Sequence, residues 1–159
     1  MITEENGVFH IRTDTYSYLF KIDAYGLAEH LHFGAPVKTR DAGALSCRPG
    51  LGWGTGILLD PKDTASCPDV LPLEWSGSGR GDYRESPLEL TGEPGDFRYA
   101  GYKIHEGGVP MACGLPQAHD APETLEITLR QPGAELTLFY TAFPTAIVRR
   151  TVLTNTGDK

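Results

Sequence analysis

The stretch Glu123-Thr-Leu-Glu-Ile-Thr-Leu-Arg-Gln-Pro-Gly-Ala-Glu-Leu-Thr-Leu-Phe-Tyr-Thr-Ala142 decides the fold class of this chain. Apolar residues fill every second position from Leu125 to Leu129 and again from Leu136 to Tyr140. A period of two places successive side chains on opposite faces of a β-strand. Pro132-Gly133 lies between the two runs and is typical of a tight turn. The stretch therefore predicts two antiparallel strands, each with one buried face.

The same period continues on both sides of this stretch. Downstream, Ile147 to Asn155 alternates, and Pro144 ends the preceding strand because proline cannot donate to a ladder. Upstream, Tyr16 to Ile22 and Leu27 to Phe33 alternate around Tyr25-Gly26 and predict a hairpin. No ten-residue segment shows a convincing apolar repeat of 3.6 residues. We therefore expect an all-β protein, an antiparallel β-sandwich of about seven to nine strands with almost no helix.

Composition limits the domain count and the possible partners. The 159 residues suit one domain or part of a larger one. Fourteen Lys and Arg residues against 21 Asp and Glu residues give a net charge of −7, and the isoelectric point is near 5.1. Nucleic acids and anionic membranes require a basic face, which this chain lacks, so we expect neither as a partner.

The sequence contains no sign of export or of metal binding. No run approaches the ~18 apolar residues of a membrane helix, and the first residues are acidic where a signal peptide would be basic. We therefore expect a cytoplasmic protein. Cys47, Cys67 and Cys113 have neither zinc-site nor disulfide-framework spacing. His30 and His32 should share one face of a strand, but no third ligand is evident nearby, so no metal site is predicted.

Two glycine-rich stretches interrupt the strand pattern. The first, Gly43 to Gly56, contains five glycines and Trp53, and such long loops are usually functional or mobile. The second runs from Trp75 to Arg84.

In the second stretch, Arg80, Asp82 and Arg84 alternate, so an extended backbone would place them on one side. There Asp82 could bridge two guanidiniums as a structural polar cluster. The functional reading is a donor-rich edge beside Trp75, a combination that suits a sugar.

The chain ends on a pattern that predicts a further strand. Asn155-Thr-Gly-Asp-Lys159 reads as a hairpin turn, yet no sequence follows it to pair with the strand before it. An unpaired flat strand is a liability that folded sheets avoid. We therefore expect residues 1–159 to be part of a β-sandwich that is incomplete at its C-terminal end.

Five ordered stretches resemble the N-terminal domain of family 36 α-galactosidases. The most specific is the acidic, aromatic, Gly, Asp, aromatic, Arg and Pro pattern between Asp69 and Pro87. The others are Gly26 to Gly34, Tyr102 to Gly107 with Gly114 to Pro116, the strand pair Glu123 to Leu129 with Leu136 to Thr141, and Ile147 to Asn155. The resemblance covers roughly residues 8–157. The sequence departs from it at Glu106 to Pro110, which lacks the family's lysine.

The resemblance implies a β-supersandwich that precedes a (β/α)8 catalytic barrel. That barrel, with both catalytic aspartates, would lie downstream, so no catalytic residue is expected in this chain. The implied parent enzyme is a retaining hydrolase of terminal α-galactosides such as raffinose or melibiose, without a cofactor, and a homo-oligomer. In several members the N-terminal domain extends a loop to a neighbouring subunit's active site. By position that loop is Cys47 to Asp60, with Arg48 and Trp53 as the substrate-contacting candidates.

A second class of function remains open on the residues alone. A stand-alone β-sandwich module could bind carbohydrate, or a protein, without any barrel. It would stack a sugar on Trp53 or Trp75. Trp53 could equally be a hydrophobic anchor that pins the glycine-rich loop. The reading frame after Lys159 would separate the enzyme from the module.

Overall fold

The computed structural model describes residues 1–48, 58–77, 82, 84–90, 95–111, 117 and 119–157. Over these residues the chain forms two four-stranded antiparallel sheets, with strands in sequence order in each. The first sheet comprises β1 (Ile2–Glu5), β2 (Val8–Arg12), β3 (Ser17–Ile22) and β4 (Ala28–Gly34). The second comprises β5 (Arg98–Glu106), β6 (Glu123–Gln131), β7 (Ala134–Ala142) and β8 (Ile147–Asn155). Two short helical turns, η1 (Thr39–Asp41) and α1 (Ala42–Leu45), follow β4.

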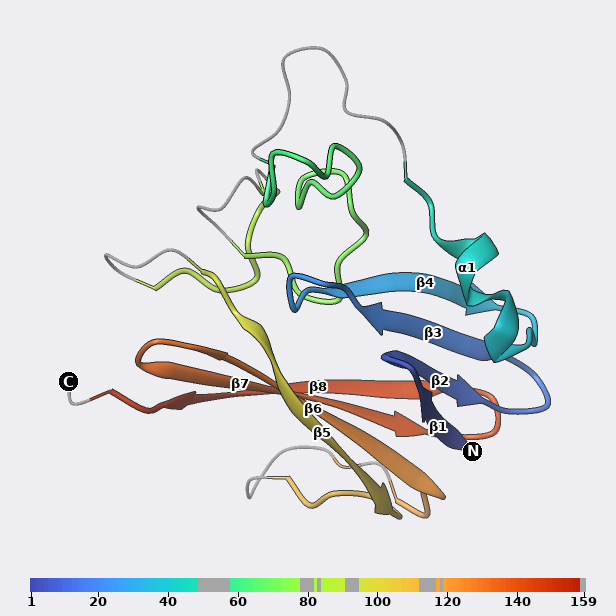
Figure 1. Cartoon of the computed structure of the whole chain (residues 1–159). Helices are drawn as coiled ribbons and strands as arrows, with labels where there is room; N and C mark the ends of the chain where they lie inside the picture. The colour runs from blue at the N-terminus through green and yellow to red at the C-terminus, as the bar shows by residue number, and fades with distance from the viewer. Residues whose placement is uncertain are drawn as a thin grey trace.

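The two sheets lie face to face as the layers of a sandwich (Figure 1). The expectation of an antiparallel β-sandwich is therefore confirmed. Turn chemistry explains the hairpins, since Gly26 has φ 77° between β3 and β4 and Gly133 has φ 76° between β6 and β7. Only glycine adopts this left-handed backbone without strain. Strand β8 has the bounds that the alternation predicted.

Helix α1 corrects the expected start of the glycine-rich loop. Gly43 lies inside this helical turn rather than in the loop. The Asp41 carboxylate accepts a hydrogen bond from the Lys38 backbone N–H at 3.4 Å, which satisfies a free donor at the start of η1. The alanines of α1 favour helix as well. Residues 46–48 of the expected loop are described as irregular backbone, and residues 49–56 lie outside the described residues.

A β-bulge corrects the expected geometry of the two histidines. The pairing of β3 with β4 aligns Leu19 with His32 but Phe20 with His30, so one residue of β4 is extra. An extra residue reverses the side on which all later side chains lie. His30 therefore points between the sheets with Phe20, and His32 points to the outer face with Leu19. The two imidazoles do not share a face.

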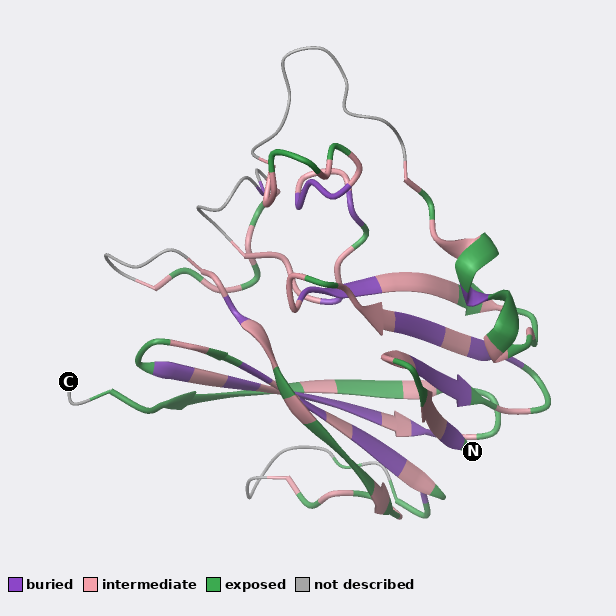
Figure 2. Cartoon of the chain, in the orientation of Figure 1, coloured by how far each residue is buried: buried purple, intermediate pink, exposed green. Residues whose placement is uncertain are grey.

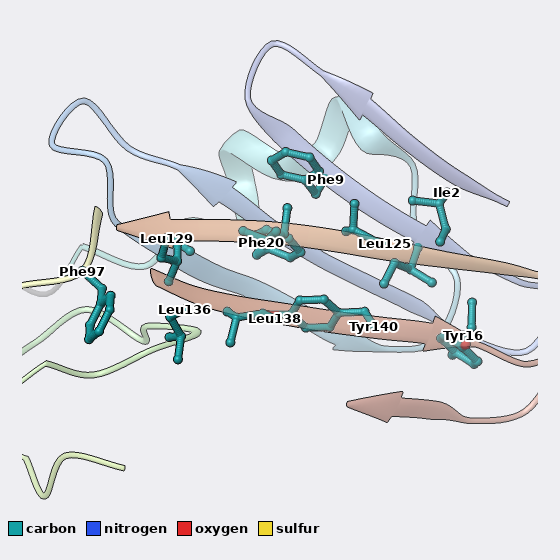
Figure 3. Close-up of a cluster of buried hydrophobic side chains, with 14 of the residues drawn as sticks. Ile2, Phe9, Tyr16, Phe20, Phe97, Leu125, Leu129, Leu136, Leu138 and Tyr140 are labelled. Atoms are coloured by element: carbon teal, nitrogen blue, oxygen red, sulfur yellow. The ribbon is translucent and has the colours of Figure 1, made fainter. Parts of the chain in front are cut away.

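The inner faces of the sheets enclose the hydrophobic core. Figure 2 shows the buried positions along the facing surfaces, and Figure 3 shows the side chains that meet there. The Phe20 ring stacks between Phe9, at 4.9 Å, and Tyr140, at 5.4 Å between ring centroids. Leu125, Ile127, Leu136 and Leu138 are fully buried in the same cluster. Each such side chain contributes about 1.5–3 kcal/mol on burial, so this layer is the main source of stability.

Candidate functional site

The candidate site is built on the segment that joins the two sheets. We call residues 35–48, which leave β4, the outgoing stem, and residues 58–77, which come back to β4, the return stem. Residues 49–57 between them are outside the described part. Figure 1 shows α1, in the outgoing stem, on the side of the first sheet that faces away from the second sheet. This outer face of the first sheet carries a layer of buried polar side chains around the fully buried Leu19.

The first half of the outgoing stem is held by a buried histidine. His10 on β2 is 2% exposed, and its Nδ1 lies 2.8 Å from Thr39 Oγ1 while its Nε2 lies 2.9 Å from Ser17 Oγ. Ser17 Oγ in turn accepts the backbone N–H of Val37 at 3.0 Å. Burial, followed by the charges of Arg12, His32 and the N-terminus, lowers the pKa of His10 below its ordinary 6.5. The folded protein therefore favours the neutral form of the His10 imidazole.

The second half of the outgoing stem is held by Glu29 on β4. This carboxylate is fully buried, and Arg48 donates to its Oε2 from Nη2 at 2.6 Å. Lys21 Nζ lies 3.3 Å from the same oxygen, and Ser46 donates to Oε1 at 3.1 Å. Lys21 also donates to Ser46 Oγ at 3.0 Å. Charge pairing and hydrogen bonding together make this burial of a carboxylate tolerable.

The return stem is held to β4 by its backbone. The His30 N–H donates to the Pro72 carbonyl at 2.6 Å, and the Glu74 N–H donates to the Ala28 carbonyl at 2.8 Å. Leu73 thereby forms an isolated antiparallel bridge with Glu29. These bonds extend the edge of the first sheet by a few residues. The stem continues as irregular backbone, which is why alternation did not predict the pairing.

Glu74 forms a second buried carboxylate at the end of the return stem, where the two sheets meet. Tyr18 and Tyr140 donate their hydroxyls to its Oε2, each at 2.7 Å, and His30 Nδ1 lies 2.8 Å from Oε1. Arg149 on β8 lies 3.5 Å from Oε2 and also bonds the Glu74 carbonyl. Burial raises the pKa of Glu74, but the hydrogen bonds from His30 and Tyr140 and the charge of Arg149 lower it by more. Glu74 therefore stays ionised and links both sheets to the stem.

The predicted polar cluster is described in part. Arg84 donates from Nε and Nη2 to the two oxygens of Asp82, each at 2.8 Å, which is a bidentate pair. Its other hydrogen bonds reach the carbonyls of Leu71 and Pro68, both at 2.7 Å. Burial raises the pKa of Asp82, and the hydrogen bonds and charge of Arg84 lower it by more. Arg80 lies outside the described residues, so the bridging of two guanidiniums stays a prediction.

The other candidate residues are also described only in part. Arg48 is placed against Glu29, whereas Trp53 lies outside the described residues. Trp75 packs against the core with its ring edge-on to Phe97, at 6.4 Å between centroids. That contact uses the ring as a hydrophobic anchor, and a sugar-stacking role for the partly buried Trp75 stays a prediction.

Sequence reasoning missed the roles of Glu29 and Glu74. The available signal was a charge inside an otherwise apolar run. Glu29 alternates in phase with Leu27 and Leu31, and Glu74 stands between Leu73 and Trp75. A carboxylate at such a position must be paired or hydrogen-bonded once it is buried. The sequence does not say with which partners.

The described residues lack two other kinds of functional feature. Among the described residues, no cluster of three or more His, Cys, Asp or Glu side chains could hold a metal ion. Within the same part of the chain, no helix has the length and apolar character to cross a membrane. The polar contacts described above hold the two stems on the first sheet. Arg48 is the last described residue before the connection between them.

Comparison with known proteins identifies the family to which this chain is similar. The chain is 31% identical to the α-galactosidase Mel36A of Lactobacillus acidophilus over 98% of its own length, and it spans 23% of that relative. The galactosidase domain of the α-galactosidase/sucrose kinase AgaSK of Mediterraneibacter gnavus superposes with a TM-score of 0.86 at 25% identity, covering 99% of this chain and 23% of that one.

A raffinose complex of an AgaA α-galactosidase variant from Geobacillus stearothermophilus also superposes. Its TM-score is 0.76 at 30% identity, with coverage of 94% of this chain and 22% of that one. The model of the glycosyl hydrolase family 36 N-terminal domain matches residues 26–159. This chain therefore belongs to the family of N-terminal domains of family 36 glycosyl hydrolases.

Proposed function

We propose that this chain is the N-terminal part of an α-galactosidase that hydrolyses terminal α-galactosides of the raffinose and melibiose type. The observation that carries the proposal is the similarity of nearly the whole chain to α-galactosidases, one of them bound to raffinose. The chain spans about a quarter of the curated relatives it matches, so most of the enzyme would follow it. In this proposal the sandwich is continued and followed by a (β/α)8 barrel.

The proposed reaction is double displacement with retention of configuration. It uses one carboxylate as nucleophile and a second as acid and base, about 5–5.5 Å apart. The two most deeply buried carboxylates described here are unsuited to either role. Glu29 is paired with Arg48 and Lys21, and Glu74 is surrounded by four donors. Because the resemblance to family 36 α-galactosidases implies that both catalytic aspartates lie in the barrel, we assign catalysis there and expect no activity from residues 1–159 alone.

Within the enzyme, this part would build the subunit and deliver a loop. We assign residues 47–60 to a loop that reaches the active site of a neighbouring subunit in a homo-oligomer. Arg48 and Trp53 would contact the galactoside there. Support comes from the polar layer, because it fixes the outgoing stem up to Arg48 on a rigid sheet. A fixed stem limits the positions that a long connection can sample.

The test is an activity assay on the full-length protein that contains this chain. Release of p-nitrophenol from p-nitrophenyl α-galactoside, and of galactose from raffinose, is expected from the full-length enzyme but not from purified 1–159. Trp53→Ala should raise KM for raffinose or reduce the oligomer seen by analytical ultracentrifugation, with the thermal midpoint unchanged. A full-length protein without turnover would refute the proposed activity. Turnover by 1–159 would refute the assignment of catalysis to the barrel.

A further inference from the structure

Glu29 contacts both the outgoing and the return stem at one point of the first sheet. Its side chain receives Arg48 and Ser46 from the outgoing stem, at 2.6 and 3.1 Å. Its backbone position is bridged to Leu73 of the return stem. Ser46 and Arg48 lie more than twenty positions before Leu73 in the sequence, and a single strand residue links them. Such a residue fixes where the two stems lie relative to each other.

The charge at this point favours a further acceptor. Lys21 and Arg48 both reach Oε2 of Glu29. Two cations therefore share one carboxylate, which is fully buried. The Nη1 atom of Arg48 is buried and, within the described residues, has no hydrogen-bond acceptor.

We infer that Glu29 is a positioning residue, which orients the Arg48 guanidinium and holds the end of the outgoing stem on β4 beside the return stem. The inference rests on the proposed function, in which Arg48 contacts the galactoside. Holding Nη2 on Glu29 fixes the plane of the Arg48 guanidinium, and the arginine side chain, which is 26% exposed, can then meet a substrate hydroxyl in a fixed orientation. Glu29 does not touch the substrate in this scheme. Its effect on catalysis passes entirely through Arg48 and the two stems.

The test compares two carboxylates in the full-length protein. Glu29→Gln is matched by Glu126→Gln, because Glu126 also faces a lysine and a second basic group, Lys103 and His105, but on the other sheet. Glu29→Gln should raise KM for raffinose about tenfold with kcat changed much less, the effect expected when one hydrogen bond from a charged group is lost from substrate binding. Glu126→Gln should leave both parameters unchanged.

A double variant shows whether Glu29 acts through Arg48. If it does, the KM of Glu29→Gln with Arg48→Met equals that of Arg48→Met alone. Additive effects, or an unchanged KM in a folded Glu29→Gln protein, would overturn the inference. Should Glu29→Gln fail to fold, Ser46→Ala removes a single hydrogen bond to the carboxylate and should raise KM in the same direction. An unchanged KM in Ser46→Ala would then count against it.

Hydrogen exchange separates this inference from the proposed activity. Backbone amides of residues 42–48 and 71–74 in the full-length protein should exchange faster in Glu29→Gln than in Glu126→Gln. This readout needs no turnover, so it applies even if the protein proves inactive on α-galactosides. Equal exchange of both stems in the two variants would reject Glu29 as their common anchor, whether or not the enzyme hydrolyses galactosides.

Discussion

The two faces of the first sheet are built on opposite principles. Its inner face is apolar and packs Phe9 and Phe20 against the second sheet. Its outer face buries His10, Ser17 and Glu29 beneath the outgoing stem. Apolar contacts are strong but non-directional, whereas hydrogen bonds and ion pairs fix orientation. The difference indicates that the inner layer stabilises the sandwich and the outer layer positions the stems.

The largest effect should come from the inner layer. Leu138 on β7 is fully buried, so Leu138→Ala should lower the free energy of unfolding by about 2–5 kcal/mol through lost transfer energy and the cavity left behind. Urea unfolding followed by tryptophan fluorescence measures this loss. Leu153→Ala on β8 is the matched control, since Leu153 is 44% exposed and should change stability by less than about 0.5 kcal/mol. Equal losses would mean that the inner layer is not the main source of stability.

Glu74 is the exception within the inner layer, and its removal should have the next largest effect. Glu74→Gln keeps the shape but removes the charge that Arg149, His30 and two tyrosines contact. Loss of charged hydrogen bonds at a buried site should cost about 2–3 kcal/mol. Thermal unfolding measures it, with Glu126→Gln as the more exposed comparison. A loss under about 0.5 kcal/mol would show that the carboxylate is not needed at the junction.

The outer layer should make the stability of the fold depend on pH. The pKa of His10 is below 6.5 in the fold and returns to about 6.5 on unfolding, so the unfolded chain binds the proton more tightly. Stability is then full above pH 6.5 and falls as the pH drops from 6.5 toward the lowered pKa. Glu74 and Asp82 have pKa values below those of ordinary carboxyls, so their contributions are lost at more acidic pH.

Unfolding midpoints between pH 7 and 5 check the His10 expectation. The His10→Gln variant should lose most of the slope in this interval, because glutamine can still bond Thr39 and Ser17 but does not titrate. The whole effect should be smaller than that of Glu74→Gln. An unchanged slope in the variant would assign the pH dependence to other groups and leave His10 with a packing role alone.

The smallest effect should come from the outer face of the second sheet. Arg130 and Glu135 form an ion pair at 2.7 Å across β6 and β7, and the arginine side chain is 64% exposed. Exposed pairs contribute about 0.2–1 kcal/mol at most, because solvent screens them. Arg130→Gln should therefore shift the thermal midpoint only slightly, and added salt should erase the difference. A loss comparable to that of Glu74→Gln would contradict the distinction between buried and exposed polar groups drawn here.

What could be predicted from the sequence was local. The alternation of Leu125 to Leu129 and of Ile147 to Asn155 predicted strands β6 and β8, and Gly26 predicted the β3–β4 hairpin. These features depend on neighbours within a few residues, through strand period and turn conformation. Strands β1, β2 and β5 were not located individually, since Ile2 to Glu5 is short and mostly polar and β5 carries mixed residues. The family was identified from ordered motifs, and the comparisons confirm it.

Only the tertiary structure decided which side chains meet. The bulge that separates His30 from His32 depends on the pairing of β3 with β4, and a one-residue slip changes the face of each later residue. Glu74 reaches Tyr18 and Tyr140 across 56 and 66 residues of sequence. Glu29 joins stems that alternation could not pair. Periodicity states that a position will be buried, but a buried charge is tolerated only by particular partners, which long-range packing supplies.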